Sequence, residues 1–82
     1  MLVVINADDL GLHPAVTRAV EELAGRGRLA SASLMANGPC VRDALALSGL
    51  GIGVHLNLLR GRPLGPPAET ESFTAPDGFM LG

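Results

Sequence analysis

The chain has 82 residues, about half of the roughly 150 that serve as a prior for one domain, so it holds one domain or part of one. Hydrophobic residues make up 48% of it, but Trp and Tyr are absent and Phe73 and Phe79 are the only aromatic residues. We therefore expect a thin aliphatic core, since a chain of this size buries only about 60 to 65% of its unfolded surface. Cys40 is the only cysteine, which excludes an intrachain disulfide and a thiolate metal cluster.

The charged residues exclude further classes of function. All six basic residues are Arg, so mechanisms that need a Schiff-base lysine or a phosphate-binding lysine are excluded. The Arg residues are scattered and the formal net charge is −2, which argues against a nucleic-acid partner. No apolar run reaches the roughly 18 residues of a membrane span, and no basic segment precedes the apolar N-terminus. We expect no membrane span and a cytoplasmic location.

The first part of the chain predicts a strand and then a helix. Met1–Ile5 is a short apolar run that ends at turn-forming and acidic residues, as in a strand buried on both faces. Pro14 suits the first turn of a helix, and Gly25 and Gly27 offer capping positions at its end. The expected apolar helix face comprises Ala15, Val16, Ala19, Val20, Leu23 and Ala24, and the opposite face comprises Thr17, Arg18, Glu21 and Glu22.

The middle of the chain predicts two more strands around a second helix. Leu29–Ala36 has the pattern of a strand, and its small Ser and Ala residues indicate close packing. Val41–Ser48 has a helical pattern that ends at Gly49. Gly51–Leu58 alternates with the period of two that is typical of a strand. Ile52, Val54, Leu56 and Leu58 share its apolar face, and Gly51, Gly53, His55 and Asn57 share the other.

The order strand, helix, strand, helix, strand predicts an α/β fold with parallel strands joined by right-handed crossovers. We expect a single partial domain over residues 1–82, with a βαβαβ core at 1–59. Residues 60–82 are rich in Pro and Gly and predict an extended tail, with Phe73 and Phe79 as its anchors. Three parallel strands leave both sheet edges unpaired, so we expect an incomplete barrel or sheet that forms a homo-oligomer.

Two acidic residues follow the first predicted strand, at the end of a parallel sheet where ligands bind. Asp8 and Asp9 are adjacent, and from an extended backbone neighbouring side chains point in opposite directions. One carboxylate can therefore coordinate a cation while the other serves as a general base. In the alternative interpretation, one Asp caps the following helix and the other is solvated.

The polar face of the third predicted strand brings an imidazole to the same end of the sheet. Neutral imidazole and carboxylate are suitable ligands for a divalent ion, so His55 is a candidate metal ligand beside the Asp pair. A single His is more often a hydrogen-bonded structural residue, and that alternative stays open. The other histidine, His13, directly precedes a predicted helix and is expected to contribute to its start.

Four local motifs, in this order along the chain, resemble the N-terminal part of the YdjC-like carbohydrate deacetylases. They are Ile5–Leu12 (INADDLGL), Ser31–Pro39 (SASLMANGP), Gly51–Leu58 (GIGVHLNL) and Gly61–Leu64 (GRPL). The resemblance implies a TIM-barrel-like, deacetylase-type α/β fold, of which this chain represents the N-terminal βαβαβ portion. It also implies hydrolysis of N-acetyl groups on amino sugars or chitooligosaccharides, with a divalent metal ion, Mg²⁺ or Zn²⁺, bound by one Asp and two His.

The resemblance assigns roles to three residues of this chain. Asp9 and His55 match metal-ligand positions, and Asp8 matches the position of the general base. The family's second His has no counterpart here, because its motif lies beyond the segment that this chain matches, which is about the first third of the domain. We therefore expect the isolated chain to be inactive, and a non-catalytic binding or assembly module with the same fold is the alternative function.

Overall fold

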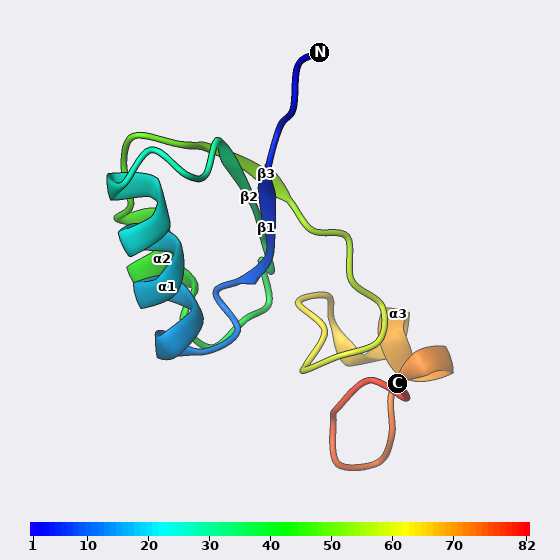
Figure 1. Cartoon of the computed structure of the whole chain (residues 1–82). Helices are drawn as coiled ribbons and strands as arrows, with labels where there is room; N and C mark the ends of the chain where they lie inside the picture. The colour runs from blue at the N-terminus through cyan, green and yellow to red at the C-terminus, as the bar shows by residue number, and fades with distance from the viewer.

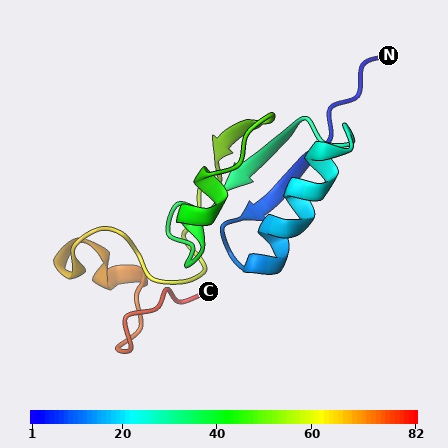
Figure 2. The same cartoon turned by 90° about the vertical axis from the view of Figure 1, so that its left-hand side faces the viewer.

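The computed structural model describes residues Met1–Gly82 as a parallel three-stranded sheet with helices on one face, followed by a C-terminal segment beyond the sheet (Figure 1). The strand order β1-β2-β3 follows the chain, and both strand pairs are parallel. Figure 2 shows both crossover helices in front of the sheet. The βαβαβ prediction is confirmed. The elements are β1 (Asn6–Leu10), α1 (Pro14–Gly25), β2 (Ser31–Leu34), α2 (Val41–Leu45) and β3 (Gly51–Val54).

The first strand lies later in the chain than the apolar run that predicts it. The prediction of a buried strand at Met1–Ile5 is wrong, because β1 spans Asn6–Leu10 and the side chains of residues 1–5 are exposed. The partner strand β2 begins at Ser31, opposite Asn6. Residues 1–5, which precede β1, therefore have almost no backbone partner. Among them, only the Ile5 carbonyl accepts a hydrogen bond, from the Ala30 N–H. The Asp pair therefore lies within the strand and not after it.

Helix α1 begins where the sequence predicts, but the face that it buries is rotated about the helix axis relative to the predicted face. Pro14 is its first residue, and His13 caps it through a hydrogen bond from the Ala15 N–H to Nδ1 at 3.0 Å. Thr17, predicted on the polar face, is buried together with Val20. The contact with the sheet and with α2 decides which side of α1 is covered. The core under the helices consists of Leu10, Val20, Leu29, Ala32, Leu34 and Ala44.

The other elements of the sheet are shorter than predicted. β2 and β3 form a ladder of four residue pairs, from Ser31 opposite Gly51 to Leu34 opposite Val54. Past this ladder the His55 N–H still donates to the Leu34 carbonyl, and then β3 loses its partner. The strand prediction to Leu58 fails because alternation in sequence cannot show where the neighbouring strand ends.

The C-terminal segment is more ordered than the predicted extended tail. It contains α3 (Pro67–Thr70), the 3-10 helix η1 (Glu71–Phe73) and a single bridge between Thr74 and Met80. Met80 is buried, Phe73 is half-buried, and the exposed ring of Phe79 lies 4.3 Å from the Arg62 guanidinium carbon. Local turns and the buried Met80 therefore order this segment, which lies beyond the carboxyl ends of the strands (Figure 1).

The face of the sheet opposite the helices is uncovered, and the outer edges of β1 and β3 have no strand partner. All four residues of β3 are exposed, and Val54 retains 72% of its accessible surface. Further along the chain Leu56 and Leu58 are exposed as well. None of the helices has the length and apolar character needed to cross a membrane.

We expect the isolated chain to associate through this exposed apolar edge, since burying it gains about 25 cal/mol for each Å² removed from water. Light scattering over a concentration series should show dimers or larger assemblies. Val54→Glu should shift the chain toward monomer, whereas Leu45→Glu, at an exposed apolar position on α2, should not. A compact monomer at every concentration would contradict this expectation.

Candidate functional site

A β-bulge in β1 shapes the site. The pairing of β1 with β2 shifts between Ala7 and Leu10, so β1 contains one residue more than β2 over this stretch. Asp9 lies in the bulge with φ of 63°, and it is the only non-glycine residue of the chain with a positive φ. Asp and Asn tolerate this left-handed conformation better than other L-residues. Strained backbone of this kind is concentrated at functional sites, where it directs a side chain.

The bulge brings Asp9 close to His55 from across the sheet. β1 and β3 lie on opposite sides of β2, yet Asp9 Oδ1 and His55 Nδ1 are 3.6 Å apart. This distance is too long for a hydrogen bond. His55 Nδ1 is shielded from solvent and has no hydrogen-bond partner. The structure therefore brings together the two residues that the sequence selects as metal ligands, and it leaves the imidazole nitrogen unpaired.

The expected divergence of Asp8 and Asp9 is wrong. That expectation assumes an extended backbone through both residues, whereas Asp9 is left-handed. Asp8 lies on the open face of the sheet, where its Oδ1 accepts a hydrogen bond from Asn6 Nδ2 at 3.0 Å. Asp9 reaches His55, which strand alternation also places on the open face. Neither Asp caps α1, because His13 does so.

Sequence reasoning missed a polar cluster beside Asp8. Asn6 bonds to two hydroxyls of β2, since Ser31 Oγ donates to Asn6 Oδ1 at 2.7 Å and Asn6 Nδ2 lies 3.0 Å from Ser33 Oγ. Next to β2 on this face, β3 contributes only Gly51 and Gly53. The sequence did contain a signal for this cluster. Asn6, Ser31 and Ser33 are small or polar residues at alternating strand positions, and such residues rarely line a dry core.

A second cluster fixes the loop that follows His55. Asn37 Nδ2 donates to the carbonyls of Arg60 and Arg62 at 2.8 and 3.0 Å, and Asn57 Nδ2 donates to Asn37 Oδ1 at 3.0 Å. Gly61 lies between the two carbonyls with φ of 78°, and a Cβ there would be 3.1 Å from Asn37 Nδ2. The two Asn side chains thus hold the loop 60–62 against the carboxyl end of the sheet.

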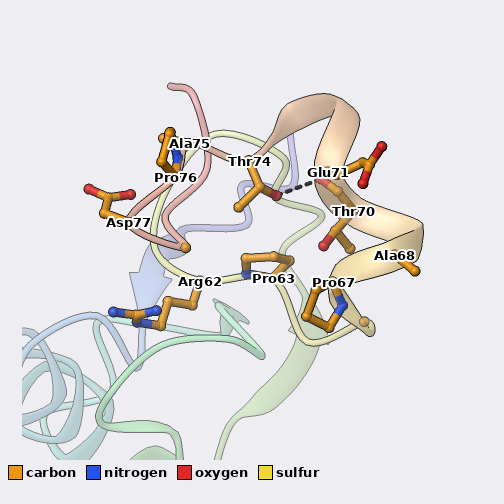
Figure 3. A pocket seen from close by; sticks show the side chains of 12 residues that line it. Arg62, Pro63, Pro67, Ala68, Thr70, Glu71, Thr74, Ala75, Pro76 and Asp77 are labelled. Atoms are coloured by element: carbon orange, nitrogen blue, oxygen red, sulfur yellow. Dashed lines mark hydrogen bonds between the residues drawn. The ribbon is translucent and has the colours of Figure 1, made fainter.

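Two cavities lie at this end of the molecule. One of about 300 Å³ separates the end of β3 from the C-terminal segment, and His55, Asn57, Leu56, Phe73 and Met80 contribute to its lining. The other, of about 830 Å³, lies within the C-terminal segment between Arg62, α3 and the turn at Asp77 (Figure 3). None of Asp8, Asp9 and His55 lines the larger cavity. The smaller one is therefore the hollow that adjoins the candidate site.

The chain by itself supplies an incomplete metal site. No group of three or more His, Cys, Asp or Glu side chains lies close enough to hold one ion. The chain has two histidines, and Nδ1 of His13 is engaged in capping α1. The arrangement offers one carboxylate and one imidazole for an ion, with a second carboxylate close by in the sequence.

Parallel strands with a carboxylate and an imidazole at their carboxyl ends define an α/β protein whose ligand site lies at that end of the sheet. The sequence matches the family model described as YdjC-like protein over residues 2–82. The chain therefore belongs to the YdjC-like family, and the resemblance seen in its motifs is confirmed.

Several relatives share this region. A carbohydrate deacetylase from Homo sapiens is 36% identical over 86 aligned positions, which cover 100% of this chain and 27% of the relative. A chitooligosaccharide deacetylase from Enterobacter sp. (strain 638) is 42% identical over 76 positions, covering 87% of this chain and 30% of the relative. The chain thus spans less than a third of each of these relatives.

A solved structure shares the fold. The crystal structure of a protein from Enterococcus faecalis V583, described as a cellobiose-phosphate cleavage protein, superposes with a TM-score of 0.83 at 32% sequence identity. The match covers 94% of this chain and 32% of that chain. The βαβαβ arrangement and the C-terminal segment therefore correspond to about a third of a larger protein in this neighbour.

We expect substitutions of Asp9 to separate the role of its backbone from that of its side chain. Glycine adopts φ of 63° without strain, whereas a β-branched residue there costs about 1 to 2 kcal/mol. In urea unfolding, Asp9→Gly should keep the free energy of unfolding at or above that of the original chain. Asp9→Val should lower it by about 1 to 2 kcal/mol. Equal stability of the two variants would show that the bulge relaxes in solution.

Proposed function

We propose that this chain is part of a metal-dependent hydrolase that removes N-acetyl groups from amino sugars or chitooligosaccharides. The observation that carries the proposal is the 3.6 Å approach of the Asp9 carboxylate to the unpartnered Nδ1 of His55, with Asp8 next to Asp9 in the sequence. Relatives named carbohydrate deacetylase and chitooligosaccharide deacetylase support the reaction and the substrate class.

The residues fit a divalent metal ion. A buried imidazole nitrogen without a hydrogen-bond partner loses the interactions it would have in water, and a cation restores one. Its neighbour is a carboxylate oxygen at 3.6 Å, and one ion can contact both atoms because metal–ligand bonds are about 2 Å long. Imidazole suits Zn²⁺ and carboxylate suits Mg²⁺ or Zn²⁺. We therefore propose Asp9 and His55 as two of the ligands.

The chain's own residues divide the remaining chemistry. When bound, the ion supplies Lewis acidity, which polarises the amide carbonyl and lowers the pKa of a water molecule toward about 7. Asp8 accepts a proton from the attacking water, because one of its oxygens is free of the Asn6 hydrogen bond. The amine that leaves needs a proton, which either protonated Asp8 or a residue outside this chain would supply. His55 serves as a metal ligand in this scheme and accepts no proton.

The complete site needs at least one more ligand. We propose a second His, supplied by residues outside these 82, as the third protein ligand. The complete domain is proposed to be a TIM-barrel-like fold in which further strands cover the exposed edges of β1 and β3. The 82-residue chain alone should then bind metal weakly and turn over substrate poorly.

The same incomplete ligand set favours a second candidate function. A module that lacks a third donor could act in binding or assembly and not in catalysis. The two functions differ in one measurable property. If the chain is part of an enzyme, the complete protein that contains it releases acetate from a chitooligosaccharide in the presence of Mg²⁺ or Zn²⁺. If the chain is part of a binding module, that protein does not.

We expect Asp8→Asn to reduce amide hydrolysis by about 10²- to 10⁴-fold, the usual contribution of a general base, with a much smaller change in metal affinity. His55→Ala should lower both. The measurements are acetate release and calorimetric titration of Mg²⁺ and Zn²⁺ into the complete protein that contains this chain and into its variants.

The matched control for His55→Ala is His13→Ala, which removes the only other imidazole of the chain. His13→Ala should weaken the cap of α1 and leave metal affinity unchanged. Equal loss of metal affinity in Asp8→Asn and His55→Ala would mean that Asp8 is itself a ligand.

A further inference from the structure

We propose that Asn6 is a positioning residue that holds the Asp8 carboxylate for proton transfer, with Ser31 and Ser33 holding Asn6 in turn. The inference rests on the proposed function of Asp8 as the general base. Its starting observation is the hydrogen bond from Asn6 Nδ2 to Asp8 Oδ1 at 3.0 Å. The two residues are two positions apart in β1, so their side chains leave the strand on the same face.

The direction of the Asn6 amide is fixed by its three partners. Asp8 as a carboxylate can only accept, so the amide nitrogen must face it. Asn6 Oδ1 then faces Ser31, whose hydroxyl donates to it at 2.7 Å. The second amide hydrogen is directed to Ser33 Oγ, 3.0 Å from Nδ2. An amide turned the other way would place its oxygen against the carboxylate of Asp8.

The two serines are themselves held in register by the sheet. Asn6 pairs with Ser31 in the β1–β2 ladder, and Ser33 is two residues further along β2 on the same face. The glycines opposite them on β3, Gly51 and Gly53, have no side chains that could compete for these hydroxyls. A rigid ladder therefore sets the position of Asn6, and Asn6 sets the position of Asp8.

The cluster acts on Asp8 and not on the proposed metal ligands. Asn6 makes no hydrogen bond to Asp9 or His55. Its bond to Asp8 uses Oδ1, which leaves Oδ2 to receive a proton. Loss of Asn6 should therefore slow the chemical step without changing metal binding. This combination distinguishes positioning of the base from a general structural role.

The kinetic test compares Asn6→Ala, Asn6→Asp and the control Ser72→Ala in the complete protein that contains this chain, with N-acetylated chitooligosaccharide as substrate. Asn6→Asp retains an acceptor for both serine hydroxyls, but it replaces the donor to Asp8 by a carboxylate oxygen that repels Asp8. Both Asn6 variants should lower kcat about 10- to 100-fold, as expected for a hydrogen bond to a charged group, with KM and metal affinity within about twofold. Ser72 is exposed, and its variant should match the original protein.

A double-mutant cycle decides whether Asn6 acts through Asp8. In an Asp8→Ala background, Asn6→Ala should cause no further loss of kcat, because the group it positions is gone. A further 10-fold loss in that background, or loss of metal affinity in Asn6→Asp, would overturn the proposal. Absence of acetate release from the complete protein that contains this chain would contradict the proposed function instead.

An NMR measurement tests the hydrogen bond even if no activity is found. The side-chain amide protons of Asn6 should shift upfield in Asp8→Ala and stay in place in Asp9→Gly. Unchanged Asn6 amide signals in Asp8→Ala would overturn the proposal whatever the kinetics show.

Discussion

The left-handed backbone at Asp9 is the constraint on which the candidate site depends. Strand alternation alone would send the side chains of Asp8 and Asp9 to opposite faces, one of them into the helix-covered core. The extra residue of the bulge lets Leu10 occupy the core position while Asp9 turns toward His55. The left-handed residue Asp9 therefore allows β1 to provide both the buried Leu10 and two adjacent carboxylates on the open face of the sheet.

The sheet is divided into a packing face and a chemical face. Its packing face carries Ala32 and Leu34 of β2 against the helices. Its open face carries hydroxyls, amides and glycines, which leave room above the strands and provide hydrogen bonds. The Asn6 cluster joins several of these groups in one hydrogen-bond network on the solvent-exposed face.

The carboxyl end of the sheet is also tied to the C-terminal segment. Asn37 follows β2 and Asn57 follows β3, and together they bind the loop that leads into that segment. His55 approaches Asp9 to 3.6 Å and lines a cavity of about 300 Å³ together with Phe73 and Met80. The C-terminal segment therefore forms part of the surroundings of His55, whereas Asp8 does not line this cavity.

The sequence by itself determined the order of elements, the start of α1 at Pro14, the selection of Asp8, Asp9 and His55, and the family. These follow from local patterns and motifs, which depend on neighbouring residues only. The tertiary structure alone decided where β1 lies, that Thr17 is buried, that Met80 anchors the C-terminal segment, and that Asn6 holds Asp8. Each of these depends on a partner that is distant in the sequence: β2 for the register of β1, the sheet for the rotation of α1, and Ser31 for the direction of Asn6.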